Sequence, residues 1–129
     1  MISGWKGDEV NLSVMKSVFP NFELADFTMF DKIISLKWET VFDSESWEEY
    51  KILTLKMVST DNYKILMEFI GVDLFRFEGD GRLSGFYVKD MFVRGYENAA
   101  RYEVGDYEED ELRFYCSDVI IKSLEKPER

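Results

Sequence analysis

Residues 50–71, YKILTLKMVSTDNYKILMEFIG, decide the fold of this 129-residue chain. Apolar and polar residues alternate through both halves of the stretch, as they do in strands that bury one face. The halves are separated by Thr-Asp-Asn at 60–62, and Asp and Asn favour turns because their side chains bond to nearby backbone. The pattern therefore predicts two antiparallel strands, residues 50–59 and 63–69, joined as a hairpin.

The alternation changes phase at Gly71. Before this glycine the apolar positions are odd-numbered, whereas Val72 and Leu74 follow at even positions and Phe75 and Phe77 at odd ones. A glycine inside a strand pattern often marks a bulge or a tight bend. We therefore expect a bulge or a bend in the sheet at this point.

Further alternating segments make the chain mainly β. Besides the hairpin and residues 72–77, they cover residues 30–42, 83–93, 101–106 and 112–121, with a phase shift at Ser117-Asp118. The connections are short, which allows antiparallel neighbours, whereas parallel pairing needs long crossovers. We expect a bent antiparallel sheet of about seven strands, either a sandwich or an open barrel.

The N-terminal part of the chain has a weak helical pattern. Three valines recur at four-residue spacing within residues 8–18, Asp8 could cap the start, and Pro20 forces the helix to end before it. This predicts one short N-terminal helix packed on the sheet. The length suits a single domain over residues 1–129.

The charge balance restricts the kinds of partner. Twenty-six acidic and sixteen basic residues give a net charge of -10. Such a charge repels nucleic acid and anionic membranes, because phosphate binding needs clustered Lys and Arg. A basic protein remains a suitable partner. With a single cysteine, no recognisable signal peptide and no long apolar run, we expect a cytoplasmic protein.

Histidine is absent, which removes the most common acid–base group of enzymes. Nucleophiles activated by His and zinc sites containing His are excluded, and one cysteine cannot form a thiolate zinc site. Carboxylate pairs, Lys or Tyr could still carry chemistry, but no spacing singles out a pair. Cys116 lies in an alternating apolar segment and is expected to be buried and inert. We expect no enzyme activity, no cofactor and no metal.

Residues 105–119, GDYEEDELRFYCSDV, contain five carboxylates within six positions. One interpretation is a solvated hairpin tip whose charges keep a sheet edge from pairing with other chains. Another is a site for a basic partner, because mutual repulsion would be relieved by cations and Tyr107 could add contact area. A metal site is a third interpretation, but the spacing does not match a calcium loop.

A second acidic stretch, DSESWEE, occupies residues 43–49. Trp47 within it is either a core residue that folds back from the loop or an exposed anchor for a partner. The core interpretation is the expected one. If both acidic stretches lie on one side of the fold, the hypothesis of a basic partner becomes stronger.

The segment YEVGDYEEDELRFYCSDVIIKSLE, residues 102–125, resembles the last hairpin of small bacterial immunity proteins from polymorphic toxin systems. KIISLKWE and YKILMEFIGVDLF, at residues 32–39 and 63–75, resemble their earlier strands. The similarity covers roughly residues 31–125, and its most particular motif is FYC-x-D at 114–118.

The resemblance implies a cytoplasmic protein that binds and neutralises a cognate toxin domain. Many such toxins are basic nucleases, so an acidic inhibitor would be attracted to its target by charge complementarity. Carried over by position, the partner-binding residues are Asp106, Tyr107, Glu108, Glu109 and Asp110, with Trp47, Glu48 and Glu49 as second choice. The alternative is a β-domain that binds a ligand or another subunit, through an aromatic-lined pocket or a dimer face.

Overall fold

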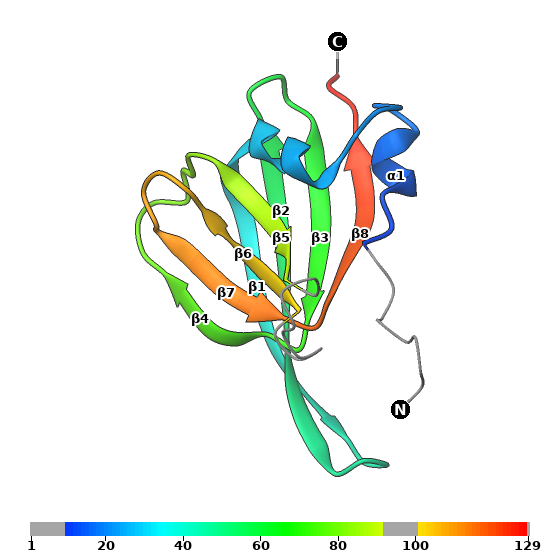
Figure 1. Ribbon diagram of the computed structural model, residues 1–129, viewed down its shortest axis with the longest axis vertical. Helices are drawn as coiled ribbons and strands as arrows, with labels where there is room; N and C mark the ends of the chain where they lie inside the picture. The colour runs from blue at the N-terminus through cyan, green and yellow to red at the C-terminus, as the bar shows by residue number, and fades with distance from the viewer. Residues whose placement is uncertain (1–9, 92–100, 129) are drawn as a thin grey trace.

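The computed structural model describes residues 10–91 and 101–128, in which eight strands form two antiparallel sheets (Figure 1). The strand order is β1-β2-β3-β8 in the first, here called the long sheet, and β4-β7-β6-β5 in the second, the short sheet. The strands are β1 (Phe30–Asp43), β2 (Glu48–Ser59), β3 (Lys64–Ile70), β4 (Asp73–Phe77), β5 (Phe86–Asp90), β6 (Tyr102–Asp106), β7 (Leu112–Cys116) and β8 (Asp118–Glu125). Both sheets are open rather than closed into a barrel. The expected mainly β, antiparallel fold is confirmed.

The hairpin predicted for residues 50–69 is formed by β2 and β3. Its register runs from Ile52 opposite Ile70 to Val58 opposite Lys64. Asn62 in the turn has a φ of 69°, a left-handed conformation that Asn adopts more easily than most residues. The face of the hairpin that carries Leu, Met and Phe is buried in the core, as the alternation predicted.

The predicted bend at Gly71 is the point where the chain leaves the long sheet and enters the short one. Gly71 has a φ of 73°, and its N–H and that of Val72 both donate to the carbonyl of Lys51, at 2.9 and 3.0 Å. A Cβ at Gly71 would come within 2.5 Å of the Ser117 Oγ. Glycine is therefore required by both the backbone conformation and the close approach of the returning chain.

Ser117 is where the chain crosses back from the short sheet to the long one. Its backbone N–H and its hydroxyl both donate to the carbonyl of Ile70, each at 2.9 Å. The phase shift predicted at Ser117-Asp118 therefore separates two strands, β7 and β8, that pair in different sheets. This division explains why the described residues hold eight strands where about seven were expected.

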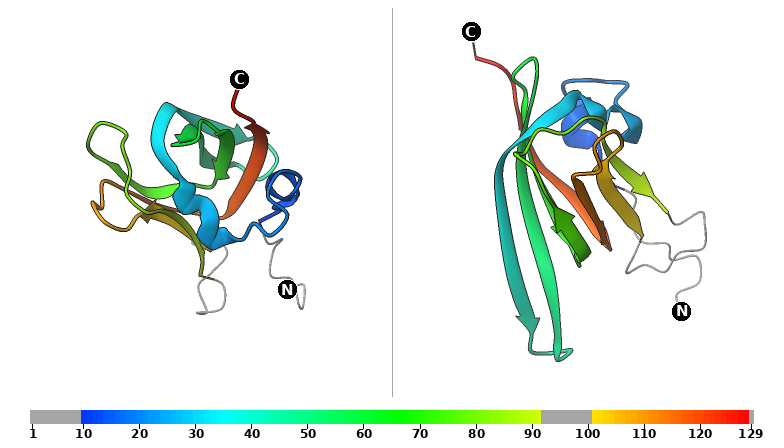
Figure 2. Two further views of the ribbon diagram at one scale, coloured as in Figure 1. Left: turned by 90° about the horizontal axis from the view of Figure 1, so that it is seen from above. Right: turned by 90° about the vertical axis from the view of Figure 1, so that its left-hand side faces the viewer.

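The core lies between the sheets, which face each other in Figure 2. Phe69 of β3 and Phe114 of β7 are fully buried and meet edge to face, with ring centroids 5.1 Å apart. Burial of each such ring stabilises the fold by about 1.5–3 kcal/mol. Cys116 is buried in the same core, and desolvation raises the pKa of its thiol. The expected buried position of Cys116 is confirmed, and the raised pKa keeps the thiol protonated.

Two short helices cover one end of the sheets. The expected N-terminal helix is confirmed as a single turn, α1 (Ser13–Lys16), which packs on β8, whereas Asp8 lies outside the described residues. A 3₁₀ helix that the sequence did not predict, η1 (Leu24–Met29), packs on β5. Its Phe27 is fully buried against Phe86, with ring centroids 6.4 Å apart. The strand expected at residues 83–93 is confirmed as β5, and residues 92 and 93 lie outside the described part.

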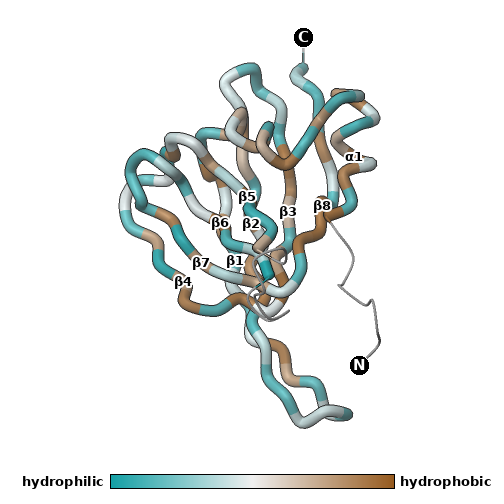
Figure 3. Tube along the Cα trace, viewed as in Figure 1, coloured by the Kyte–Doolittle hydropathy of each residue, from teal (hydrophilic) through white to brown (hydrophobic). Residues whose placement is uncertain are grey.

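The hairpin of β1 and β2 projects beyond the rest of the molecule (Figure 1). β3 pairs with β2 only from Ile52 onward, so residues 40–51, here called the arm, are held by the β1–β2 pairing. Figure 3 shows hydrophobic segments of the arm between hydrophilic ones, with a hydrophilic tip. The arm thus exposes apolar residues away from the core.

Candidate functional site

The acidic run between β6 and β7 forms a hairpin turn that is held by hydrogen bonds to the buried Asp106. The Asp106 Oδ1 accepts hydrogen bonds from the backbone N–H groups of Glu111 and Leu112, both at 2.9 Å. The residue is only 3% exposed. Asp106 therefore serves the turn and offers almost no surface to a partner, although the sequence placed it among the contact residues.

Asp110 in the same turn forms ion pairs with two arginines of the short sheet. Its Oδ1 lies 2.9 Å from an Arg76 nitrogen and 3.0 Å from an Arg113 nitrogen. Desolvation raises the pKa of Asp110, but the hydrogen bonds and charges of the two arginines outweigh it and leave the pKa lowered. The negative charge of Asp110 is thus balanced within the molecule.

Tyr107, Glu108 and Glu109 remain as the exposed part of the predicted site. Tyr107 is 65% exposed, and its ring stacks on Tyr87 with centroids 4.2 Å apart. The N–H of Tyr107 donates to the carbonyl of Gly85, and that of Glu108 to the carbonyl of Ser84, both at 3.1 Å. These bonds tie the turn to the β4–β5 loop.

The β4–β5 loop adds further carboxylates to the same surface. Glu78 and Asp80 are exposed, and the N–H of Glu78 donates to the carbonyl of Glu111 at 2.7 Å. Desolvation raises the pKa of the Glu111 carboxyl first, and repulsion from nearby carboxylates raises it further. These carboxylates belong to Asp106, Asp80, Glu109 and Glu78. We call the surface formed by Glu78, Asp80, Glu108, Glu109 and Glu111 the acidic end.

The contribution of the β4–β5 loop to this surface was not predicted from the sequence. Its residues 78–81, Glu-Gly-Asp-Gly, have the composition of a turn and were not connected with the acidic run. Gly79 has a φ of 107°, and a Cβ there would overlap the Glu111 carboxylate. A turn rich in glycine that also carries acids was the available signal, but its position beside residues 106–111 depends on the pairing of β4 with β7.

The second predicted acidic stretch forms the tip of the arm, where Trp47 is 80% exposed. The expectation that Trp47 belongs to the core was wrong. Its left-handed φ of 59° closes the turn, and its ring contacts only Phe42 among the ring pairs of the described residues, with centroids 6.0 Å apart. Glu48 and Glu49 are exposed too, and Glu49 pairs with Lys51 at 2.8 Å. Because β3 ends before the arm, β1 and β2 are the only strands of the described residues that reach Trp47.

The two acidic loops lie at opposite ends of the molecule. In Figure 1 the β6–β7 turn is at the upper left and the tip of the arm at the bottom, and the right-hand view of Figure 2 shows the same separation. The two loops therefore do not form one continuous surface. A partner that covers the acidic end would leave the tip of the arm free.

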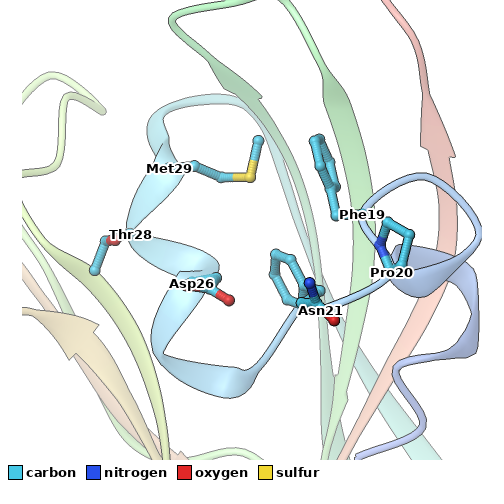
Figure 4. Close-up of a pocket in the computed structure, with 7 residues that line it drawn as sticks. Phe19, Pro20, Asn21, Asp26, Thr28 and Met29 are labelled. Carbon is cyan, nitrogen blue, oxygen red and sulfur yellow. The ribbon is translucent and has the colours of Figure 1, made fainter.

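A mainly apolar, open groove is formed by η1 and the segment that precedes it (Figure 4). It has a volume of about 500 Å³ and is lined by Phe19, Pro20, Phe22 and Met29, with Asp26 at its side. The groove lies outside the space between the sheets, which is filled by the core. Neither Asp106 nor Glu111 lines it, so the two neighbouring carboxyls do not face a substrate-sized cavity there.

Within residues 10–91 and 101–128, no three His, Cys, Asp or Glu side chains are grouped so as to hold a metal ion. None of the described helices is long and apolar enough to cross a membrane. Comparisons with protein-family models, curated proteins and solved structures gave no match.

Proposed function

We propose that this chain is a non-enzymatic, acidic binding protein that neutralises a cognate basic toxin domain in the bacterial cytoplasm. The observation that carries the proposal is the acidic end, where two loops far apart in sequence bring their carboxylates together. The resemblance of the strands to immunity proteins gives the class of partner.

The electrostatics of the acidic end favour a cationic partner. Desolvation, and after it repulsion from neighbouring carboxylates, raises the pKa of Glu111, and a bound Lys or Arg would relieve that repulsion. A concentrated negative surface also increases the rate of encounter with a basic protein, and salt screens this effect. Tyr107 stands exposed beside these charges and adds the aromatic area that interfaces favour.

The contact residues in this proposal differ from those carried over by sequence. Tyr107, Glu108 and Glu109 remain, Glu78 and Asp80 are added, and the buried Asp106 and the paired Asp110 act by holding the turn. Trp47, Glu48 and Glu49 lie at the other end and take no part in the same contact.

The proposal expects the neighbouring gene to encode a basic toxin domain, and its test is protection of a bacterial cell from that domain. Co-expression of the wild type should restore growth. The double variant Glu108→Lys, Glu109→Lys should fail to protect, because it places cations against a basic partner. The double variant Glu48→Lys, Glu49→Lys makes the same charge change on the arm and should still protect. Absence of protection by the wild type, or equal protection by both variants, contradicts the proposal.

A further inference from the structure

Within residues 10–91 and 101–128, strand β1 has a free edge along much of its length. At its start the β4–β5 loop covers this edge, because the N–H of Ile33 donates to the carbonyl of Gly81 at 2.7 Å and that of Leu83 to the carbonyl of Asp31 at 2.8 Å. Beyond this point, among the residues described, β1 pairs with β2 alone and is the outermost strand of the long sheet. An uncovered edge of this kind can pair with another strand.

The register shows which residues direct their backbone groups toward the open edge. In an antiparallel pair, residues alternate between facing the partner strand and turning both backbone groups away from it. Ile33 turns away from β2, since its N–H bonds to the loop, and it stands opposite Met57. The β2 residues that follow from Met57 in steps of two are paired with Leu36, Trp38, Thr40 and Phe42 of β1. These four β1 residues therefore turn their backbone groups toward the open edge.

A second observation gives the same assignment. Thr40 stands opposite Lys51, and the carbonyl of Lys51 points away from β1, because it accepts hydrogen bonds from Gly71 and Val72. Both members of such a pair turn away from each other, so the N–H and carbonyl of Thr40 face the open edge.

The side chains along this edge are unusually apolar for an exposed position. Trp38 is 42% exposed and Phe42 is 56% exposed, and both extend from the same face of β1 as Thr40. Trp38 packs on one side against Phe75, with ring centroids 5.1 Å apart. A strand added beside β1 would cover both rings and satisfy the free backbone groups at once.

We propose that the chain forms a twofold-symmetric homodimer in which β1 pairs antiparallel with β1 of a second copy, centred on Thr40. In this register Trp38 lies opposite Phe42 of the second copy, and Lys37 lies opposite Asp43 of the second copy. By symmetry each contact occurs twice. Aromatic pairs and pairs of opposite charge directly across an antiparallel ladder are stabilising.

Neighbouring registers of the same strand fit less well. A centre on Glu39 would place this carboxylate against its own copy, and like charges directly opposite each other are destabilising. A centre on Trp38 would set Asp43 opposite Ile33 of the second copy, where the edge is already occupied by the β4–β5 loop. The register centred on Thr40 uses only the open part of the edge.

The shape of the molecule allows this pairing. The arm projects from the sheets (Figure 2), so two antiparallel arms can lie side by side while the two bodies remain at opposite ends. The second copy is favoured over a foreign strand because one short segment supplies both members of each charged and aromatic pair. The acidic end lies away from the open part of this edge, so the dimer does not depend on the function proposed above.

Analytical ultracentrifugation across a series of protein concentrations tests the proposal. The wild type should reach twice the 15.3 kDa mass of one chain. Thr40→Pro should remain at the mass of one chain, because proline removes an N–H that faces the open edge and leaves the β1–β2 bonds intact. Thr40→Val keeps that N–H and should still dimerise. If Thr40→Pro does not fold, Phe42→Lys provides the second variant and should also stay monomeric.

Amide hydrogen exchange gives a readout specific to this edge. The N–H groups of Trp38, Thr40 and Phe42 should exchange more slowly as the wild-type concentration rises, whereas those of the Thr40→Pro variant should not change. A wild type that stays monomeric, a dimer unaffected by Thr40→Pro and Phe42→Lys, or an edge that pairs only with another protein's strand overturns the proposal.

Discussion

At the scale of single residues, the carboxylates of the β6–β7 turn differ by what surrounds them. Asp106 is buried and accepts two backbone hydrogen bonds, Asp110 is held by two arginines, and Glu108 and Glu109 face the solvent. Glu111 lies among other acids, and one of its oxygens is buried with no hydrogen-bond partner among the described residues. The same type of side chain thus stabilises the turn at two positions and concentrates charge at the others.

Replacing Asp106 with Ala should destabilise the fold. The change leaves the N–H of Glu111 and that of the buried Leu112 without their acceptor, and an unsatisfied buried group costs about 1–3 kcal/mol. Urea denaturation measures the loss. Glu109→Ala is the matched control and should change stability by less than about 0.5 kcal/mol, as surface substitutions do. Equal stability of the two variants would show that the Asp106 bonds are unimportant.

Glu111 and Asp110 should have opposite effects on the pH dependence of stability. The pKa of Glu111 is raised in the folded chain, so its contribution to stability is present at low pH and is lost as pH rises through that pKa. The pKa of Asp110 is lowered, so its contribution is present above the ordinary Asp pKa and is lost as pH falls through the folded value.

Melting temperatures at about pH 3 and about pH 7, on either side of the ordinary carboxyl pKa values, separate the two effects. Glu111→Gln should raise the Tm at the higher pH and have little effect at the lower one. Asp110→Asn should lower the Tm at the higher pH, with a smaller effect at the lower one. A Glu111→Gln variant that is less stable than the wild type near pH 7 would contradict the repulsion between carboxylates.

At the scale of elements, the crossings between the sheets determine the fold. Gly71 takes the chain out of the long sheet, Ser117 brings it back, and the hydroxyl of Ser117 bonds to the carbonyl of Ile70 beside Gly71. The two crossings therefore hold each other in place. β4, β5, β6 and β7 are the elements that they connect to the long sheet.

Replacing Gly71 with Ala should cost at least about 1–2 kcal/mol, the penalty of a left-handed backbone for a residue with a Cβ. The new methyl group would also press on the Ser117 Oγ. Chemical denaturation of Gly71→Ala, Ser117→Ala and the double variant forms a cycle that separates the two costs. If Gly71→Ala is as stable as the wild type, the crossing does not need its observed backbone conformation.

The sequence predicted the elements with regular alternation much better than the others. β1, β2 and β3 carry a period of two over many residues, so their existence and the hairpin of β2 and β3 could be derived locally. The sequence showed the shift at Ser117 but not that it separates two sheets, because that depends on distant pairing. η1 was missed because its apolar residues follow no helical period.

The sequence located the acidic run of the candidate site, but not which of its side chains are buried, paired or exposed. Asp110 pairs with Arg76, thirty-four positions away, and this contact cannot be derived from the acidic run itself. Burial of Asp106 depends on the closed turn, and exposure of Trp47 depends on where β3 ends. Composition gave the sign of the charge, whereas the fold decides which charges are free.

At the scale of the whole molecule, two ends of the structure differ in chemistry, one being acidic and the other carrying exposed aromatic rings. The acidic end gathers carboxylates from two loops, and the arm carries exposed rings along a free strand edge at the other end. The two proposed partners, a basic toxin domain and a second copy of the chain, would therefore bind independently. Variants at one end should leave binding at the other end unchanged.

The most direct test of the proposed function is the calorimetric affinity of the purified chain for the basic toxin domain that we propose the neighbouring gene encodes, measured at several salt concentrations. The wild type should bind, and its affinity should fall as salt rises. Glu108→Lys, Glu109→Lys should bind at least about tenfold more weakly, a loss of about 1.4 kcal/mol, whereas Glu48→Lys, Glu49→Lys should bind as the wild type does. Equal affinities of the wild type and the Glu108→Lys, Glu109→Lys variant would contradict the account.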